Sequence, residues 1–304
     1  APVPPPARGG GPGWGHEDQA LTYQPPPSPP PQAGEGERGG GGITVSTPDS
    51  FLSTAEAAAE SAGAAIRPLF RSALLVEAKG DASPVTEADR AAERAIRSLI
   101  AERHPDHGVI GEEYGDTNPD AEWVWVLDPI DGTRAFVTGR PLFGTLIGLL
   151  RRGVPVLGVI DQPATGERWI GVAGRPTTFR SPMGGTPRCR PCPALADAEL
   201  SCTSPDMFDA ATAPRFAAAK AAARRVTWGG DCYAYGLLAL GLVDVVVDAT
   251  MKSWDWAALV PVIEGAGGRC TDWAGRPLRL DGDGTVLAVG DPALLTEVSN
   301  ILSR

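Results

Sequence analysis

The sequence predicts a mixed α/β fold in which two successive halves each combine helices with a sheet. One observation is that helical periodicity over residues 49–103 gives way to a series of short, extended apolar runs. Another is that strand-like and helical patterns alternate after a Gly/Pro-rich stretch at 174–193. The composition agrees with a globular protein, because 42% of the 304 residues are hydrophobic and 21% are charged.

The expected domain boundaries follow from composition. More than half of residues 1–42 are proline or glycine, and a segment so rich in both, without a period, is typical of disorder. We therefore expect a disordered tail over residues 1–48, for which the remnant of a plastid transit peptide is one interpretation. Residues 49–183 are then expected to form an N-terminal α+β subdomain that binds metal, and residues 184–304 a C-terminal α/β subdomain.

The first half is expected to begin with two helices. A Ser/Asp cap and helical spacing predict a helix over 49–74, and a second helix follows over about 85–103, where Pro105 stops it. Extended runs come next, separated by glycine and proline turns. They read "HGVIGEE", "WVWVLD", "GTLIGLLRRG", "PVLGVID" and "ERWIGVA". This half therefore mixes helix and sheet.

The second half alternates the two kinds of element. Its strand-like segments are "AELSCTS", "VDVVVDA" and "GTVLAVG". Helical patterns cover residues 211–224, "CYAYGLLALG", "WDWAALVPVIEGAGG" and the chain from residue 292. The alternation again predicts helices packed with a sheet.

Net charge and cysteine content limit the partners. The formal net charge of −10 argues against nucleic acid or an anionic membrane, because both require a basic face. No apolar run approaches the roughly 20 residues that a membrane span needs. Five cysteines, an odd and sparse number, indicate reduced thiols in a reducing compartment. Cys189 and Cys192, in "CRPC", leave three interpretations open: half a zinc site, a redox couple, or ordinary thiols.

Several acidic residues stand at the ends of predicted elements or on the second helix, rather than on solvated faces. They are Asp89, Glu112, Glu113, Asp128, Asp131 and Asp255. Taken alone, each fits an ordinary helix cap or a strand-end charge. Taken together, oxygen ligands without histidine or cysteine favour a hard cation, Mg²⁺ above all, or else Ca²⁺ or Mn²⁺.

The stretch "WVWVLDPIDGTRAF" places such a cation beside an anion site. The strand is expected to deliver Asp128 to the sheet edge, Pro129 to force a turn, and Asp131 to point back to the same place. Gly132 and Thr133 then begin a helix, whose free N–H groups attract an anion. Cations next to an anion pocket describe a centre for phosphoryl transfer.

Three segments, "VIGEEYG", "WVLDPIDGTRAF" and "SWDWAALVPVIEGAGG", resemble in order and spacing the signatures of the inositol-monophosphatase-like Mg²⁺-dependent phosphatases. The resemblance covers about residues 50–304. Within that family "KGDASPVTEADRAAE" and "WGGDCYAYGLLALGLVDVVVDA" are most similar to the histidinol-phosphate phosphatase branch. The resemblance implies a layered αβαβα sandwich, a homodimer and two to three Mg²⁺ ions in each active site.

By the same resemblance, roles are carried over position by position. The first ion is expected to be held by Glu112, Asp128 and the backbone carbonyl of Ile130, the second by Asp128, Asp131 and Asp255, and a weaker third near Glu112. Thr133 and Asp89 match the pair that positions and deprotonates the attacking water, with Glu113 close by, and the N–H groups of Gly132 and Thr133 would hold the phosphate. This hydrolysis needs no covalent phosphoenzyme.

Asp231 and Asp248 are the candidates for recognising the organic part of the substrate. Histidinol phosphate carries an amine and an imidazole that both become cationic, and carboxylates suit either group. The alternatives are a helix cap for Asp231 and a strand-end charge for Asp248. Tyr233 or Tyr235 lines the same pocket or packs in the core.

These expectations combine into one function. The protein is expected to be a Mg²⁺-dependent phosphomonoesterase that hydrolyses L-histidinol phosphate to L-histidinol and phosphate by metal-activated water, in histidine biosynthesis. The alternatives are an inositol monophosphatase or another small sugar-phosphate phosphatase, and a non-catalytic phosphatase-like scaffold. The expected partner is a small phosphate monoester, and the expected compartment is the plastid stroma or the cytoplasm.

Overall fold

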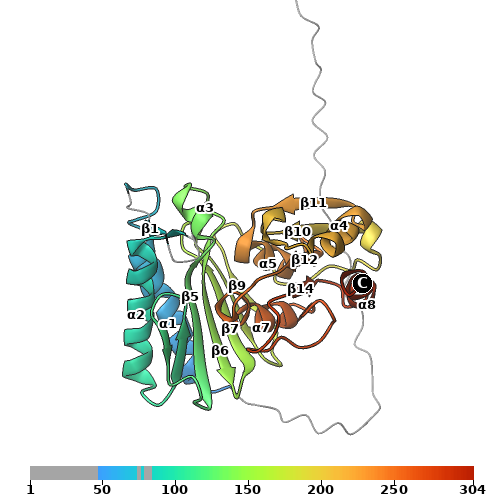
Figure 1. Cartoon of the computed structure of the whole chain (residues 1–304). Coiled ribbons are helices and arrows are strands. Elements are labelled where there is room, and N and C mark those ends of the chain that lie inside the picture. Colours follow the sequence, from blue (N-terminus) through green and yellow to red (C-terminus); the bar gives the residue numbers. More distant parts are fainter. Residues whose placement is uncertain (1–46, 74–76, 79–83) are drawn as a thin grey trace, which may run out of the picture. The chain divides into compact units, whose positions relative to one another are not determined.

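Five layers of secondary structure follow one another in the described part of the chain, and they confirm the predicted αβαβα sandwich (Figure 1). The computed structural model describes residues 47–73, 77–78 and 84–304. A helix pair covers one face of a seven-stranded sheet, three helices lie between this sheet and a five-stranded sheet, and two helices cover the far face of the latter. The expected tail, residues 1–48, lies almost wholly outside the described residues.

The helices begin and end where local chemistry allows. They are α1 (Asp49–Ile66), α2 (Glu87–Arg103), α3 (Thr133–Val137), α4 (Ala213–Ala222), α5 (Asp231–Ala239), α6 (Ser253–Trp256), α7 (Leu259–Gly265) and α8 (Leu294–Leu302), with short 3₁₀ turns at Leu195–Asp197 and Pro205–Met207. The predicted first helix was too long, because it stops at Ile66, just ahead of Pro68, which lacks the N–H that a helix interior needs. Of the described helices, none is both long enough and apolar enough to cross a bilayer.

The seven-stranded sheet is built from the first half of the chain. In spatial order its strands are β4 (Gly115–Thr117), β3 (Gly108–Gly111), β5 (Trp123–Asp131), β6 (Gly144–Arg151), β7 (Val154–Gln162), β8 (Glu167–Val172) and β9 (Thr178–Arg180). Only the β3–β5 pair is parallel among these neighbours. The parallel pair brings the ends of β3 and β5, with the acidic residues that follow them, to the same edge.

The five-stranded sheet comes from the second half. Its spatial order is β11 (Arg225–Trp228), β10 (Glu199–Cys202), β12 (Val245–Asp248), β14 (Val286–Val289) and β13 (Arg269–Thr271). Strand β10 is parallel to both of its neighbours, whereas β14 is antiparallel to both of its own. A separate short ribbon pairs β1 (Glu77–Ala78) with β2 (Pro84–Val85) ahead of α2.

A row of glycines on three neighbouring strands lets α6 and α7 lie directly on the seven-stranded sheet. Gly158 of β7 pairs with Gly148 of β6 on one side and with Gly171 of β8 on the other. A Cβ at Gly158 would stand 1.9 Å from the backbone oxygen of Ala258, and one at Gly171 would stand 2.2 Å from the backbone of Pro261. No side chain fits at these positions, so the helix backbone takes the space. The glycine row thereby sets the height of α6 above β5 and β6.

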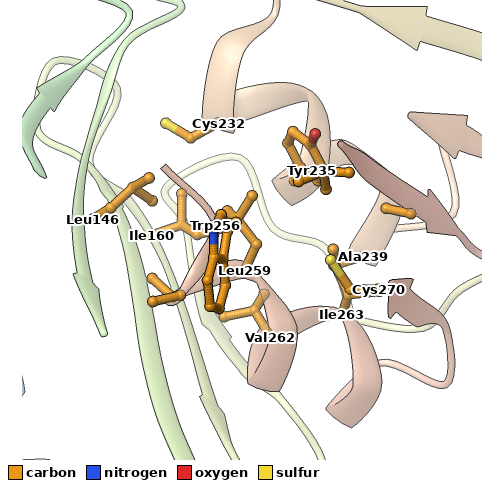
Figure 2. Close-up of a cluster of buried hydrophobic side chains, with 14 of the residues drawn as sticks. Leu146, Ile160, Cys232, Tyr235, Ala239, Trp256, Leu259, Val262, Ile263 and Cys270 are labelled. Carbon is orange, nitrogen blue, oxygen red and sulfur yellow. The ribbon is translucent and has the colours of Figure 1, made fainter. Parts of the chain in front are cut away.

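Apolar side chains fill each gap between layers. Figure 2 shows the middle gap, where Leu146 and Ile160 of the seven-stranded sheet face Trp256, Leu259 and the other side chains of α5 to α7. The gap under α1 and α2 is lined largely by alanine on α1, which allows the two helices to approach each other and the sheet. A third cluster, under α4 and α8, includes Phe216, Trp273 and Leu294. These packed gaps make the sheets rigid supports for the loops at their edges.

Two stacked histidines lie at the C-terminal end of α2, where both contact Phe51 of α1. The rings of His104 and His107 are 4.6 Å apart and nearly parallel. Trp125 Nε1 donates a hydrogen bond of 3.0 Å to His107 Nδ1, which therefore carries no proton. Burial and the neighbouring His104 lower the pKa of His107 to about 4. Protonation of His107 would break this hydrogen bond and place a charge in the stack.

We expect this histidine pair to make the protein sensitive to acid. The unfolded state, with a histidine pKa near 6.5, binds a proton on His107 that the folded state refuses until about pH 4, so stability falls as the pH drops through that interval. His107→Gln keeps a side-chain acceptor for Trp125 and should lose less stability between pH 7 and pH 5. Urea unfolding midpoints at both values check this expectation. An equal drop in variant and wild type would show that His107 does not contribute.

Candidate active site

A β-bulge brings Asp128 and Asp131 to the same side of β5. Asp128 pairs with Leu146 and Asp131 with Gly144, so three steps along β5 match two along β6. In a regular strand, residues three apart would point to opposite faces; the extra residue removes that opposition. The sequence predicted a turn at Pro129, but the strand continues through it to Asp131. Proline fits there because a bulged residue has no ladder hydrogen bond to donate.

Internal hydrogen bonds hold the bulge. The N–H of Ile130 donates to Asp128 Oδ1 at 3.0 Å, and the Thr145 hydroxyl donates to the carbonyl of Pro129 at 2.8 Å. The Thr133 hydroxyl donates to the carbonyl of Ile130 at 3.0 Å. These three hydrogen bonds give the bulge a defined conformation and hold the two carboxylates beside it in place.

The third carboxylate of the cluster comes from α6, more than 120 residues further along the chain. Asp255 lies in the first turn of that helix, and its Oδ2 accepts a hydrogen bond of 2.7 Å from the N–H of Lys252. Oxygen atoms of Asp128, Asp131 and Asp255 all lie within 4.8 Å of one another. In the described part of the chain, no other group of histidine, cysteine and acidic residues meets the geometry of a metal site.

The carboxyl groups of this cluster disfavour one another's ionisation. Burial and the charges of Glu112, Asp131 and Asp255 raise the pKa of Asp128 well above its usual range, and burial raises that of Asp131 in the same way. Burial also raises the pKa of Asp255 to about 7. Acids this close and this buried ionise together only when a cation offsets their charge. The cluster therefore fits a divalent cation bound through oxygen alone.

Glu112 joins the cluster from the turn after β3. Its N–H donates to the carbonyl of Leu127 on β5 at 3.2 Å, and its charge is among the causes of the raised pKa of Asp128. Glu113 follows in the same turn, and its N–H donates to Glu93 of α2. The structure thus brings Glu112 to Asp128, as the sequence motif predicted, and places Glu113 next to it along the chain.

Asp89 offers one free oxygen atom to the site. It is buried in the first turn of α2, where its Oδ2 accepts hydrogen bonds from the N–H and the hydroxyl of Thr86, at 2.8 and 2.6 Å. Its Oδ1 has no hydrogen-bond partner, although it is also buried. Burial and the charge of Glu112 raise the pKa of Asp89. A buried carboxylate oxygen without a partner, in a residue that interacts electrostatically with Glu112, is the feature expected where a cation or a water completes the site.

Helix α3 starts where the sequence predicted. Gly132 precedes its first residue, Thr133, and adopts the left-handed conformation with φ of 82°. A Cβ at Gly132 would approach the carboxylate of Asp231 to 3.0 Å. Glycine is therefore required on two grounds, the backbone conformation and the close approach of α5.

A cavity of about 160 Å³ opens beside the cluster. Its lining includes Asp131 and Asp255 from the cluster and Asp231, Tyr235 and Asp248 from the second half of the chain. The cavity therefore joins the predicted metal ligands to the predicted recognition residues. The lining comes from both sheets and from the helices between them: Asp131 ends β5 and Asp248 ends β12, whereas Asp231 and Tyr235 lie on α5 and Asp255 lies on α6.

Asp231 and Asp248 differ in how their carboxylates are satisfied. Asp248 is fully buried and accepts hydrogen bonds from the N–H and hydroxyl of Thr203 and from the hydroxyl of Tyr235. Asp231 begins α5 with a left-handed φ of 45°, and no described residue donates a hydrogen bond to its carboxylate. Burial and the charge of Asp248 raise its pKa to about 6, against the opposing effect of Arg140 and Arg134.

Sequence reasoning missed two contributors to this region. The N–H of Cys232, at the start of α5, donates to Asp131 Oδ2 at 2.5 Å, and Thr203 anchors Asp248. Both donate through a backbone N–H, which every residue except proline carries, so that contact leaves no signal in the sequence; Thr203 adds its hydroxyl as a second donor. Tyr233, in contrast, turns away from the cavity and donates to Glu167 of β8 at 2.7 Å, whereas Tyr235 lines the cavity wall.

The structure reduces the number of interpretations for the pair Cys189 and Cys192. Both thiols are free, and burial raises the pKa of Cys189 to about 11 and that of Cys192 as well. Redox exchange and zinc binding both require the thiolate, which these surroundings disfavour. Ordinary buried thiols are the interpretation that the structure favours.

Fold and acidic cluster together match a class of phosphatases. A model of the inositol monophosphatase family covers residues 47–303. The solved structure of an inositol monophosphatase from Zymomonas mobilis agrees with a TM-score of 0.77 and 45% identity, over 84% of this chain and 98% of that one. The chain belongs to the inositol monophosphatase family, whose members hydrolyse phosphate monoesters and are generally Mg²⁺-dependent.

Relatives within the family carry two kinds of name. The chain is 46% identical to the chloroplastic bifunctional phosphatase IMPL2 of Arabidopsis thaliana, over 75% of this chain and 66% of the relative. It is 39% identical to a histidinol-phosphatase of Chlorobaculum parvum, over 80% of this chain and 92% of the relative. Family membership therefore establishes a phosphatase and leaves the substrate between histidinol phosphate and inositol phosphate.

Proposed function

We propose that the protein hydrolyses L-histidinol phosphate to L-histidinol and phosphate, with Mg²⁺ as the cofactor. One observation carries the proposal: the carboxylate cluster shares a cavity with Asp231, a carboxylate that accepts no hydrogen bond from any described residue. A phosphate seated at the cluster would place a short organic group against Asp231. The named histidinol-phosphatase of Chlorobaculum parvum, at 39% identity, supports this choice.

The donor set suits two to three Mg²⁺ ions. Glu112, Asp128 and the carbonyl of Ile130 would hold one ion, and Asp128, Asp131 and Asp255 another, with a weaker ion near Glu112. All of these donors are oxygen atoms, which Mg²⁺ prefers. Mg²⁺, when bound, would supply a Lewis acid that polarises the phosphate and lowers the pKa of a nearby water.

The protein's own groups would orient that water. The Thr133 hydroxyl donates a hydrogen bond to the carbonyl of Ile130, so the hydroxyl oxygen of Thr133 remains able to accept one. Asp89 Oδ1 is a second acceptor without a partner. A water donating both of its protons, to Thr133 and to Asp89, would turn a lone pair toward phosphorus. Asp89, helped by the nearby Glu113, would then take the proton that the water loses.

Backbone donors would hold the phosphate itself. The N–H groups of Gly132 and Thr133 stand at the start of α3, where the helix leaves its first donors without intrahelical partners. Glycine at 132 adds no side chain of its own between this backbone and a ligand. The phosphate would thus lie between these donors and the carboxylate cluster.

Asp231 is the proposed selector for the cationic part of histidinol phosphate. Its carboxylate faces the cavity without an internal donor, so a substrate amine or imidazolium would supply the missing partner. Asp248 would act behind it: three internal donors already satisfy its oxygens, and its charge adds to the negative potential of the cavity. An inositol ring has no cation to offer either residue.

Asp231→Ala should therefore discriminate between substrates. We expect kcat/KM for L-histidinol phosphate to fall about 10- to 100-fold, the value of one hydrogen bond between charged groups. The loss for glycerol 2-phosphate, which has no cationic group, should be small. Asp206→Ala, an exposed aspartate outside the cavity, is the matched control. Equal losses on both substrates would remove Asp231 from recognition.

The substrate assignment has a direct test. Phosphate release from L-histidinol phosphate and from myo-inositol 1-phosphate should be compared under the same millimolar Mg²⁺. A higher kcat/KM for histidinol phosphate supports the proposal. The reverse order would identify an inositol monophosphatase, the function named for the Zymomonas mobilis structure. Background release from both would favour a non-catalytic scaffold.

We also propose the finer points of organisation. The chain would act as a homodimer. Each chain would consist of two subdomains, residues 49–183 and 184–304. The plastid stroma or the cytoplasm would be its compartment, which the free cysteines and the chloroplastic name of the Arabidopsis relative support. Light scattering coupled to gel filtration tests the dimer.

A further inference from the structure

The turn that carries Glu112 is tied to α2 by side chains rather than by the sheet alone. This turn joins β3 to β4 through residues 112–114, and Gly111 and Gly115 pair with each other at its two ends. Its first half is fixed to β5, because the N–H of Glu112 donates to the carbonyl of Leu127. Its remaining residues, Glu113 and Tyr114, find their backbone partner on α2. The position of the Glu112 carboxylate depends on both attachments.

Glu93 is the partner for the middle of the turn. Its Oε2 accepts a hydrogen bond of 2.8 Å from the N–H of Glu113, and its Oε1 accepts one of 3.2 Å from the N–H of Tyr114. The Glu93 side chain is completely buried. A Cβ at Gly111 would stand 2.2 Å from Glu93 Oε1, so the turn admits this carboxylate only because residue 111 is glycine.

Arg97 completes the attachment one helical turn later. Its Nε donates to Glu93 Oε1 at 2.7 Å, which neutralises the buried carboxylate, and a second nitrogen donates to the carbonyl of Gly115. Glu93 and Arg97 together therefore hold both sides of the turn, and we call them the α2 clamp. The clamp adds no net charge to the site.

The same helix face also presents Asp89. Residues 89 and 93 are four apart, so their side chains lie one above the other on the buried face of α2. One helix thereby fixes the free oxygen atom of Asp89 and the turn that carries Glu112. Burying a charged residue on the apolar face of a helix costs free energy unless the charge is paired and hydrogen-bonded. Here each oxygen of Glu93 receives a backbone donor next to Glu112.

We propose that Glu93 and Arg97 are positioning residues for the metal site, holding Glu112 in the geometry that binds the cation beside Asp128. The inference rests on the proposed Mg²⁺-dependent function. Neither residue touches substrate or cation. Their contribution is to fix the backbone of residues 112–115, so that Glu112 does not have to be ordered when the ion binds.

Calorimetric titration of Mn²⁺ and Mg²⁺ into the metal-free, full-length protein tests the clamp without relying on turnover. Glu93→Gln puts an amide donor against a backbone N–H, so we expect metal affinity to fall about tenfold, as for other outer residues that orient ligands. Arg97→Gln keeps both acceptors of Glu93 and should give a smaller loss of the same kind. Glu87→Gln, on an exposed position of the same helix, is the control and should bind as wild type does.

A double-mutant cycle with Glu112→Gln separates positioning from general stability. If Glu93 acts through Glu112, adding Glu93→Gln to Glu112→Gln should lower the affinity little further. Full additivity, or wild-type affinity in a folded Glu93→Gln variant, would overturn the inference. If Glu93→Gln does not fold, Arg97→Gln decides the question, and wild-type affinity there would also overturn it. Absence of metal binding by the wild type, or undiminished binding by Asp128→Asn, would instead refute the proposed function.

Discussion

Asp128→Asn should nearly abolish turnover and metal binding while leaving the fold intact. Asp128 is the carboxylate proposed to contact both principal ions, and one of its oxygen atoms lies within 4.8 Å of an oxygen atom of Asp131 and of one of Asp255. An amide supplies only one neutral oxygen. Losing several kcal/mol of charge stabilisation in the transition state corresponds to a decrease in kcat/KM of about 10³-fold or more. Steady-state phosphate release and calorimetry check the two losses separately.

The same variant should be more stable than wild type when metal is absent. The folded pKa of Asp128 is raised, so the folded wild type retains a proton that the unfolded chain releases near pH 4. Folding stability is then lost as the pH rises toward the folded pKa, which is the reverse of the usual behaviour of a salt-bridged acid. Asparagine has no proton to lose. At pH 8 in EDTA, its melting temperature should therefore exceed that of wild type.

Turnover and the metal-free melting temperature together distinguish the loss of a metal ligand from a damaged fold. A damaged fold would lower both activity and the metal-free melting temperature, whereas removal of a metal ligand lowers only the first. Asp116→Asn, on the exposed strand β4, should change neither. Wild-type turnover by Asp128→Asn would refute the metal assignment at its centre.

Gly158→Ala should be among the most destabilising single substitutions in the chain. Its Cβ would stand 1.9 Å from the backbone oxygen of Ala258, and backbone, unlike a flexible side chain, cannot rotate away. Helices α6 and α7 would have to rise from the sheet. Overpacking of this kind costs about 3 kcal/mol or more in the free energy of unfolding. Urea unfolding measures that loss.

The displacement should also reach the active site, because α6 carries Asp255. Any folded fraction of Gly158→Ala should bind Mg²⁺ more weakly than wild type. Gly153→Ala is the control: that glycine has a φ of 79° and open space around its hydrogen, so only the cost of a left-handed alanine, about 1–2 kcal/mol, applies. Equal losses of stability in the two variants would contradict the close packing of α7 on the glycine row.

The layered fold could be predicted because the sequence signals for it are local patterns of apolar residues or short motifs. Apolar runs predicted the inner strands of both sheets, whereas the short edge strands β4, β9, β11 and β13 were not predicted. The second helix was expected over about 85–103, and α2 covers Glu87–Arg103. The helix start at Gly132 was equally readable, since a glycine followed by threonine after "DPID" leaves few other conformations. The first helix ended early, at Ile66, because Pro68 outweighed its apolar spacing.

What escaped prediction depends on contacts between distant segments. A proline in "LDPID" indicates a turn, and only the pairing with β6 shows that β5 bulges and continues. Asp231 and Asp248 looked alike in the sequence, yet Thr203 and Tyr235 satisfy one and leave the other open. Two further features were missed for the same reason: the hydrogen bond from the N–H of Cys232 to Asp131, and the glycine row that supports the helix of Asp255. Each requires knowing which strand or helix lies alongside.

Crystals of the full-length protein grown with Mn²⁺ and phosphate would test the central idea most directly, since Mn²⁺ replaces Mg²⁺ at oxygen sites and scatters anomalously. We expect anomalous peaks bounded by Asp128, Asp131 and Asp255, with Glu112 at their side and the phosphate between them and the start of α3. Peaks confined to other surfaces, with these carboxylates bound to nothing but each other and solvent, would contradict the account.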